Sequence, residues 1–187
     1  MQDDRYDPEL LVRGDTRNVT DEFRGMTVGA IKAELDTRRH PLHIAIENFQ
    51  HDFNIGTIVR NANAFNVAAV HIIGKRHWNR RGAMVTDRYM HVHHHATVDE
   101  FVAALPEDMR LIGVDNISGS KPLGEVELPM NAVLVFGGEG PGLSDDMVAR
   151  CEQLVAIEQF GSTRSINVGV ASGIALYEWV RRNVLNH

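Results

Sequence analysis

The stretch of sequence that decides the fold is IEQFGSTRSINVGVASGIALYEW, residues 157–179. A polar loop, Gly161–Ser165, leads into a helix that we expect to open near Asn167. The early part of that helix is built from small residues, namely Gly169, Ala171, Ser172, Gly173 and Ala175. Small side chains let a helix pack closely against another backbone or a ligand. Spacing alone therefore predicts a closely packed helix behind a polar loop.

Upstream of this segment, short apolar runs alternate with helical patterns. We expect strands over residues 42–48, 69–74, 110–115, 132–137 and 154–158. We expect helices over residues 26–39, 54–65, 98–105, 144–150 and 167–183. This alternation predicts an α/β domain with a mostly parallel sheet. Ligands of such sheets bind beyond the carboxyl ends of the strands, so the loops after Asn48, Gly137 and Glu158 are the informative ones.

The first of these loops reads NFQHDFNIGTIVR, residues 48–60. Asn54 is suited to cap or orient the helix that follows, and Gly56 in its first turn permits the close approach of a ligand. Arg60 fits a phosphate clamp, although a surface salt bridge would use the same residue. The helical period turns Arg60 away from Asn54, so both reach one site only if the backbone near Asn54 is not helical.

The second loop reads VFGGEGPGLS, residues 135–144, and has four glycines within six residues. Such a loop exposes backbone groups and leaves room for a flat ligand, although a tight structural turn has the same composition. It matches neither the dinucleotide fingerprint nor a phosphate-binding P-loop. Because Glu139 would repel a pyrophosphate, the loop favours a cofactor that lacks phosphate.

Length and composition predict one compact domain with a short appendage, residues 1–40, partly helical. The 187 residues are 43% hydrophobic, and no apolar run is long enough for a membrane helix. The acidic residues 1–7 resemble neither a signal peptide nor a transit peptide. A lone cysteine, Cys151, allows no internal disulfide and fits a reducing compartment. We therefore expect a cytoplasmic protein that does not enter membranes.

Charge is distributed unevenly along a chain whose net charge is −6. Residues 37–96 carry a balance of +5, between segments of −4 and −7. Five bases of the stretch 75–88 are candidate nucleic-acid contacts: Lys75, Arg76, Arg80, Arg81 and Arg88. Trp78 lies among them and is suited to stack on a base. A basic but merely solvated surface would show the same distribution.

Nine of the ten histidines also fall in this middle segment. The cluster His91, His93, His94 and His95 invites comparison with a zinc site, but no Cys, Asp or Glu lies nearby at ligand spacing. We therefore expect no metal. A location near an RNA surface or in a subunit interface fits these polar rings better.

Taken together, the three loops resemble the three motifs of the SpoU/TrmH branch of the SPOUT RNA methyltransferases. The first motif matches at Asn54, Gly56, Arg60 and Asn63-Ala64-Phe65. The second matches over residues 137–144, and the third matches at Ser165-Ile166-Asn167-Val168 with Tyr177-Glu178. The resemblance covers about residues 42–183, with the motifs in the right order. Glu158 and Asn66 stand where the family often has proline and glycine, which concerns local loop geometry.

The resemblance implies a SPOUT-type α/β knot over residues 41–187, in which the C-terminal segment threads a loop, and a homodimer with shared active sites. It implies S-adenosylmethionine as the cofactor. The cofactor would lie against Phe136, Gly137, Gly138, Gly142, Ile157, Ile166 and Asn167. The catalytic set would be Arg60, Asn54, Glu139, Ser165 and Asn167, with Arg164 contacting RNA or the partner subunit.

The implied reaction moves the cofactor's methyl group to a ribose 2′-hydroxyl of tRNA or ribosomal RNA. A guanidinium rarely gives up a proton, so we expect Arg60 to bind phosphate and stabilise alkoxide charge rather than act as a base. Three alternatives stay open at this point. They are a non-catalytic RNA-binding protein of the same fold, a base methyltransferase of that fold, and an unrelated α/β nucleotide enzyme.

Overall fold

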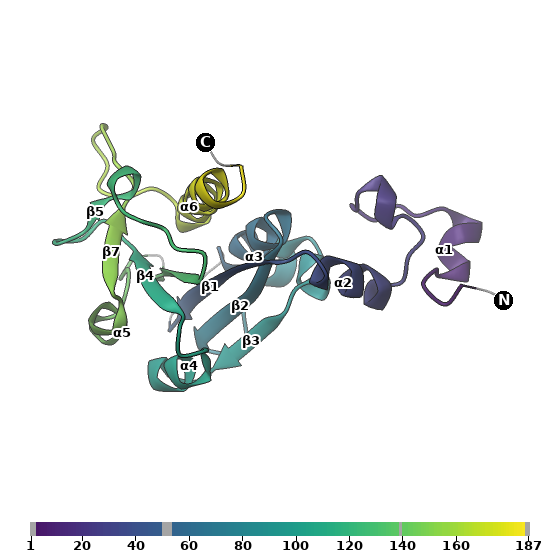
Figure 1. Ribbon diagram of the computed structural model, residues 1–187, viewed down its shortest axis with the longest axis horizontal. Coiled ribbons are helices and arrows are strands. Elements are labelled where there is room, and N and C mark those ends of the chain that lie inside the picture. The colour runs from purple at the N-terminus through teal and green to yellow at the C-terminus, as the bar shows by residue number, and fades with distance from the viewer. Residues whose placement is uncertain (1–2, 50–53, 139, 186–187) are drawn as a thin grey trace. The chain divides into compact units, whose positions relative to one another are not determined.

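The computed structural model describes residues 3–49, 54–138 and 140–185 (Figure 1). The chain divides into two compact units, residues 1–39 and residues 40–187. Within the described residues, no helix is long and apolar enough to cross a membrane. Each unit is considered by itself below.

The N-terminal unit is built from short helices, whose bounds are α1 (Pro8–Arg13), the 3-10 helix η1 (Asp21–Phe23) and α2 (Val28–Asp36). Asp7 starts α1 because its side chain accepts hydrogen bonds from the Glu9 and Leu10 amides, directly before the proline at position 8. Thr27 caps α2 in the same way through the amide of Ala30. The expected helix over residues 26–39 is confirmed, with tighter bounds.

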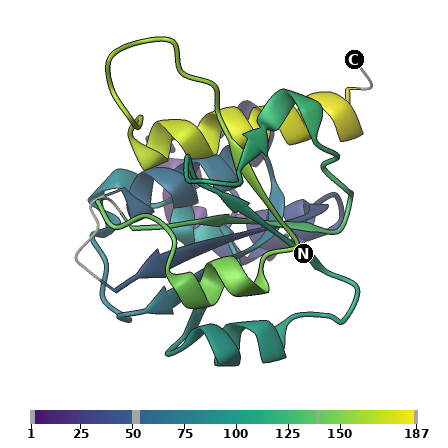
Figure 2. The same cartoon turned by 90° about the vertical axis from the view of Figure 1, so that its left-hand side faces the viewer.

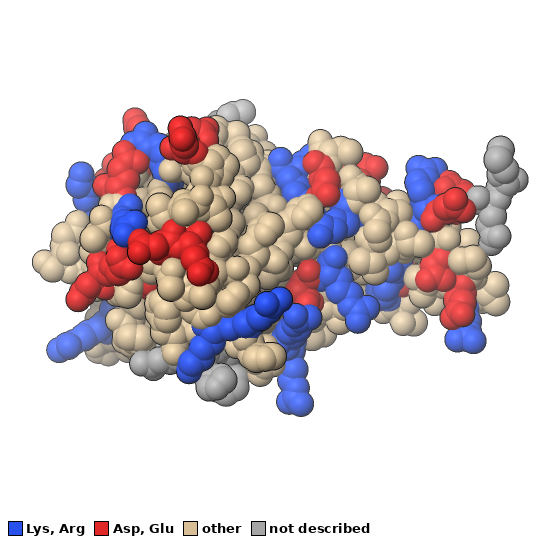
Figure 3. Space-filling view, turned by 90° about the horizontal axis from the view of Figure 1, so that it is seen from below, with Lys and Arg blue, Asp and Glu red and all other residues tan. Residues whose placement is uncertain are grey.

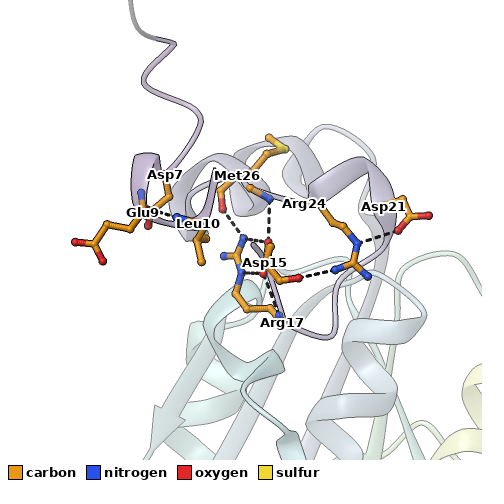
Figure 4. Close-up of polar contacts among 9 residues, drawn as sticks. Asp7, Glu9, Leu10, Asp15, Arg17, Asp21, Arg24 and Met26 are labelled. Carbon is orange, nitrogen blue, oxygen red and sulfur yellow. Dashed lines mark hydrogen bonds and ion pairs between the residues drawn. The ribbon is translucent and has the colours of Figure 1, made fainter. Parts of the chain in front are cut away.

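A polar node holds this unit together around the Asp15 carboxylate (Figure 4). Arg17 forms a two-pronged ion pair with Asp15 at 2.6 and 2.9 Å and also donates to the Met26 carbonyl. The Gly25 amide and the Arg24 guanidinium bind the Asp15 carboxylate and carbonyl respectively. Only 4% of the Asp15 side chain is exposed, and the hydrogen bond from Arg17 lowers the pKa of this carboxyl group. Polar contacts thus order a segment with little apolar core.

The larger unit is a seven-stranded sheet of order β3-β2-β1-β6-β4-β7-β5, and every pairing in it is parallel. Its strands are β1 (His40–Asn48), β2 (Val67–Gly74), β3 (Val92–His95), β4 (Arg110–Val114), β5 (Lys121–Pro122), β6 (Ala132–Phe136) and β7 (Gln153–Ala156). The central strands β1 and β6 are almost wholly buried, as parallel strands covered on both faces must be. The expected α/β class with a mostly parallel sheet is confirmed.

Helices cover both faces of the sheet (Figures 1 and 2). Four helices do so: α3 (Ile55–Ala64), α4 (Val98–Ala104), α5 (Asp145–Arg150) and α6 (Val168–Asn183). One face packs against α3 and α6 around the fully buried Trp179, whose indole N–H donates to the Pro129 carbonyl. The other face packs against α4 and α5 around Phe101 and Met147. Three 3-10 helices complete the unit: η2 (Arg80–Ala83), η3 (Thr86–Tyr89) and η4 (Leu123–Glu125).

Helix α3 ends in a left-handed residue, Asn66, with φ of +47°. This is the position where the family often has glycine. Asparagine adopts the left-handed region more readily than most residues, because its side chain bonds locally to the backbone. The departure therefore leaves the turn between α3 and β2 intact.

Candidate functional site

A cavity of about 370 Å³ opens where β4, β6 and β7 end and α6 begins. Its size falls in the range of about 300–1,000 Å³ that is usual for small-molecule sites. The walls come from four segments far apart in sequence: Val114–Asn116, the glycine loop at residues 137–142, Ile157 with Gln159, and residues 165–171. Of the three loops that the sequence singled out, those after Gly137 and Glu158 line the cavity, whereas the third described wall comes from the end of β4 and not from the loop after Asn48.

The glycine loop is folded back on itself at the floor of this cavity. A Cβ on Gly137 would lie 2.0 Å from the carbonyl carbon of Gly142, so no side chain fits there. Gly142 has φ of +72°, and its hypothetical Cβ would lie 2.4 Å from an oxygen of Asp115. The same carboxylate accepts the Leu143 amide at 2.8 Å, which ties the loop to the end of β4. Glycine is needed here for close backbone approach.

The loop also joins the start of α5. Ser144 caps α5 by accepting the Met147 amide, and its hydroxyl and amide both donate to Glu47 at 2.6 and 2.7 Å. Glu47 is buried at the end of β1. A buried carboxylate needs such donors, so this pair fixes the loop exit against β1. Glu139, which was expected in the catalytic set, lies outside the described residues.

Asn167 is locked at the first turn of α6, on the cavity wall. Its side-chain oxygen accepts the amides of Gly169 and Val170, and its side-chain nitrogen donates to Asn54 at 2.8 Å. The structure therefore brings together two residues that lie 113 positions apart. Since both ends of the Asn167 amide are engaged, this side chain is suited to holding loop and helix in register.

The lining of the cavity fits a flat ligand with polar edges. Gly138 and Gly140 line the cavity, and a Cβ on either would meet no atom closer than 3.6 Å, so side chains there would take up open space. Gln159 also lines the cavity, and its side-chain oxygen is buried without a hydrogen-bond partner. A buried acceptor without a partner costs about 1–3 kcal/mol, which a ligand donor would recover. These features are compatible with an adenosine-bearing cofactor.

Arg60 is not among the residues that line the cavity. It is exposed on α3, and Asn54 has helical dihedral angles, so the helical period separates the two side chains as the sequence predicted. Its neighbour Asn61 is the residue that joins α3 to α6, donating to the Gly169 carbonyl and the Ser172 hydroxyl at 2.9 and 3.0 Å.

The expectation for Gly56 is wrong. The space beside this glycine is filled by another segment of the chain, because a Cβ on it would lie 2.7 Å from the Ala83 nitrogen and 2.9 Å from the Asn79 carbonyl oxygen. A Cβ on Gly82 would in turn lie 3.0 Å from the Thr57 nitrogen. The glycine is needed because the segment that contains η2 packs directly on the first turn of α3.

The five basic residues expected to face nucleic acid are all exposed. The start of this stretch is held in place by the Asn48 side-chain amide, which donates hydrogen bonds to the carbonyls of Lys75 and His77. Trp78 is only half-exposed and packs against the core, with the Arg80 guanidinium over its ring at 5.6 Å. An open stacking face on Trp78 is therefore not what the structure provides. Arg164 is exposed, and its carbonyl accepts a hydrogen bond from Asn116.

Acidic and basic side chains are both present on the surface. On the face seen in Figure 3, a band of Asp and Glu side chains crosses the left-hand end, whereas Lys and Arg side chains gather along the lower rim. An acidic net charge therefore coexists with basic surface, on which a polyanion can bind.

The histidines divide into a buried row and an exposed group. His43, His71 and His95 form a hydrogen-bonded row across β1, β2 and β3, with ring nitrogens 3.0 and 2.9 Å apart. His71 and His95 are buried against Phe101. Within the expected cluster, His93 and His94 are exposed and His91 is partly exposed, so their location near an RNA surface or in a subunit interface stays a prediction. Burial, and then the neighbouring His43, His95 and His93, lower the pKa of His71 to about 3. No group of ligands in the described part of the chain is arranged for a metal ion.

Sequence reasoning missed several residues that shape the site: Glu47, Asn61, Asp115, Asn116 and Gln159. The loop after β4 ends a predicted strand, so its carboxyl-end position could have pointed to Asp115 and Asn116. Nothing in the sequence marks Asn61, because its bond to α6 depends on how two distant helices pack.

Comparison with known proteins identifies close similarities. The model of the SpoU rRNA Methylase family matches residues 41–177. The chain is 27% identical over 154 residues to a tRNA (guanosine(18)-2'-O)-methyltransferase of Escherichia coli K12, across 80% of this chain and 67% of that protein. It is 33% identical over 174 residues to the 23S rRNA (guanosine-2'-O-)-methyltransferase RlmB of Bordetella pertussis, across 86% of this chain and 68% of that protein.

Solved structures agree on the fold. The A. aeolicus TrmH/SpoU tRNA modifying enzyme superimposes with a TM-score of 0.74 at 23% identity, over 85% of this chain and 83% of that one. The SpoU methyltransferase AviRb from Streptomyces viridochromogenes, in complex with the cofactor AdoMet, gives a TM-score of 0.68 at 22% identity, over 82% and 64% of the two chains. The expected SPOUT-type fold is confirmed, and the threading of its C-terminal segment stays a prediction.

Proposed function

The chain belongs to the SpoU rRNA methylase family, and we propose that it transfers the methyl group of S-adenosylmethionine to a ribose 2′-hydroxyl of tRNA or ribosomal RNA. It is an RNA methyltransferase in which residues 41–187 form the methyltransferase domain and residues 1–40 an appendage. The observation that carries the proposal is the cavity at the strand ends, walled by the glycine loop and by Asn167. RNA of these kinds would be met in the cytoplasm.

We propose that the cavity holds S-adenosylmethionine, which supplies an activated methyl group when bound. Gly137, Gly138, Gly142, Ile157, Ile166 and Asn167 line the cavity and would contact it. Phe136 would support them from the buried end of β6. Their contribution is mainly backbone polar groups and close packing, which suits a flat adenosine with a charged tail. The loop contributes no cation for a phosphate, in keeping with a cofactor that has none.

The protein's own part in the reaction would be to position the ribose and stabilise charge on its oxygen. Arg60 would bind the neighbouring phosphate and offset the negative charge that develops as the 2′-oxygen attacks. Ser165, exposed at the cavity rim, would contact the ribose. Asn54 and Asn167 would act through their mutual hydrogen bond as positioning residues, and Glu139 would complete the set.

We propose a homodimer in which α6 supplies contact surface. Val170, Ile174 and Tyr177 are spaced four and three residues apart on α6, and 56%, 40% and 53% of their respective surfaces are exposed. Residues at this spacing share one helix face, so they form an apolar stripe that a second copy would cover. Because Arg60 does not line the cavity of its own chain, a shared site also accounts for its place in the catalytic set.

We propose that RNA binds through Lys75, Arg76, Arg80, Arg81, Arg88 and Arg164. Their contacts would be mainly to phosphates, which fix orientation and make binding weaken as salt rises. The choice between tRNA and ribosomal RNA would then rest on this surface and on residues 1–40.

The decisive experiment compares Arg60→Ala with the wild type. We expect methyl transfer from labelled cofactor to total tRNA and ribosomal RNA of a deletion strain to be abolished. Cofactor affinity, measured by calorimetry, should persist because Arg60 lies off the cavity. Arg110→Ala removes an exposed arginine at the amino end of β4 and serves as the matched control. Full activity of Arg60→Ala would remove this residue from the mechanism.

Nucleoside mass spectrometry of the same deletion strain identifies the substrate. Loss of one 2′-O-methylnucleoside, restored by the wild-type gene and not by Arg60→Ala, would name the target. If no methylated nucleoside is lost from either RNA class, the protein is a non-catalytic RNA-binding member of its fold and the proposal fails.

A further inference from the structure

Two exposed apolar residues, Met84 and Val85, form the joint between η2 and η3 inside the basic stretch. Of their surfaces, 56% and 52% are exposed. Both adopt the left-handed region, Met84 with φ of +48° and Val85 with φ of +70°. Left-handed backbone is costly for ordinary L-residues and is an outlier for a β-branched one such as valine. This turn therefore combines two unfavourable features: apolar exposure and backbone strain.

Neighbouring contacts hold the turn in this conformation. The buried Thr86 hydroxyl donates to the Ala83 carbonyl at 2.6 Å, which closes the backbone across the joint. Outside it, Arg80 and Asp87 form an ion pair at 3.4 Å. Strain of this kind persists only where surrounding contacts over-determine it, and it concentrates at functional sites. The two side chains are thus presented in a fixed position.

The turn is also tied to the candidate site through close backbone contacts. Gly56 and Gly82 pack η2 onto the first turn of α3, and Thr57 in that turn lies against Gly169 of α6. Gly169 in turn donates its amide to Asn167 on the cavity wall. Met84 and Val85 therefore project from a segment that is braced on the same helix starts as the cavity.

The charges around the Met84–Val85 turn indicate which kind of partner would bind it. The exposed bases Arg80, Arg81 and Arg88 flank the two apolar side chains. A second copy meeting this turn about a two-fold axis would oppose identical cationic clusters, which repel. RNA offers both complements at once, with phosphates for the arginines and the apolar faces of unstacked bases for Met84 and Val85.

We infer that the Met84–Val85 turn is a contact for unpaired nucleotides of the RNA substrate, packing against bases next to the methylated ribose. This inference rests on the proposed function for the identity of the RNA partner. It adds a recognition element for single-stranded loops to a surface whose other groups contact phosphates. A fully paired duplex hides its base faces and would gain nothing from the turn.

The test measures binding of the full-length chain, without cofactor, to two labelled probes: an RNA hairpin with a loop of unpaired nucleotides, and a fully paired RNA duplex of equal charge. The variants are Val85→Asn and Met84→Asn, because asparagine accepts left-handed backbone while removing the apolar side chain. The matched control is Met130→Asn. Met130 is an exposed methionine just before the amino end of β6.

We expect each turn variant to lose on the order of 10-fold in hairpin affinity, with duplex affinity changed less than about twofold. The melting temperature should stay level or rise, since strain is relieved, whereas a purely structural role would lower it. Unchanged hairpin affinity would overturn the inference. So would equal losses for both probes with a lower melting temperature, or a fall in sedimentation coefficient, which would identify a subunit contact.

The binding test is independent of methyl transfer. If the wild type methylates no RNA but the turn variants still lose hairpin affinity selectively, the proposed function fails and the RNA contact stands. If the wild type methylates RNA and the variants bind the hairpin normally, the contact fails and the function stands.

Discussion

Acid should destabilise the folded 40–187 unit through His71, whose buried ring lies between His43 and His95. Burial lowers the pKa of His71 from 6.5 to about 3. Between these two pKa values, the unfolded chain therefore binds a proton that the folded chain does not bind. Stability from this group is complete above pH 6.5 and falls as the pH drops toward the folded pKa. Near pH 5 the loss is about 2 kcal/mol, at roughly 1.4 kcal/mol per pH unit.

The burial of the neighbouring rings adds to the same trend, because the pKa values of His43 and His95 are lowered as well, first by desolvation. The measurement is urea unfolding followed by tryptophan fluorescence at a series of pH values. Trp78 and Trp179 both lie in this unit, so the signal reports on it. Two kcal/mol is a large share of the roughly 5–15 kcal/mol typical of a domain, so the slope should be easy to resolve.

His71→Phe separates this effect from general acid denaturation. The variant keeps a ring but cannot titrate. Its free energy of unfolding should therefore fall less steeply between about pH 6.5 and 5, with a slope that is smaller by the contribution of up to one bound proton. At neutral pH it should be less stable, because His43 and His95 each lose a hydrogen-bond partner. His77→Phe, at an exposed position, is the control. If His71→Phe keeps the wild-type slope, the buried ring is not the group that resists protonation, and the reasoning fails.

Two further predictions concern the proposed cofactor site and dimer. Gly137→Ala should lose most of its cofactor affinity in calorimetry, because its Cβ would overlap Gly142 at 2.0 Å. The control is Gly29→Ala, which should bind the cofactor normally because its Cβ meets no atom within 4 Å. Normal binding by Gly137→Ala would mean that the loop is not the floor of the cofactor site. Ile174→Glu should sediment as a monomer and lose methyl transfer, since a charge would be buried at the two-fold contact. Met130→Glu is its control, and an intact Ile174→Glu dimer would place the interface elsewhere.

The fold was largely predictable because its buried elements leave a periodic trace. The expected strand over residues 132–137 corresponds to β6, whose five residues are all buried. The edge strands β3 and β5 were not predicted, each for a different reason. β3 reads VHHH, so its buried ring at His95 is hidden by a polar composition, and β5 has only two residues. A pattern of hydrophobicity does not reveal a four-residue strand whose one buried side chain is an imidazole.

The candidate site was predictable as a set of loops but not as a set of contacts. Gly137 and Asn167 were assigned to the site through the motifs that resemble the family, and both line the cavity. Gly56 was misjudged because a glycine at a helix start looks the same whether a ligand or another backbone approaches it. Asp115 was missed because its partner, the Leu143 amide, lies 28 residues away. Which atom fills the space beside a glycine is decided by tertiary packing alone.

The position of Arg60 is one reason for the proposal that the site is shared between two chains. Asn54 keeps helical backbone, so α3 runs with an unbroken period and Arg60 faces away from the Asn54–Asn167 pair. No rotamer change reverses a helical phase, and Asn61 pins α3 to α6, which prevents the helix from turning as a body. A catalytic role for Arg60 at its own cavity would therefore need α3 to unwind. In the homodimer proposed above, in which a second copy covers the apolar stripe on α6, Arg60 would instead act at the partner's cavity.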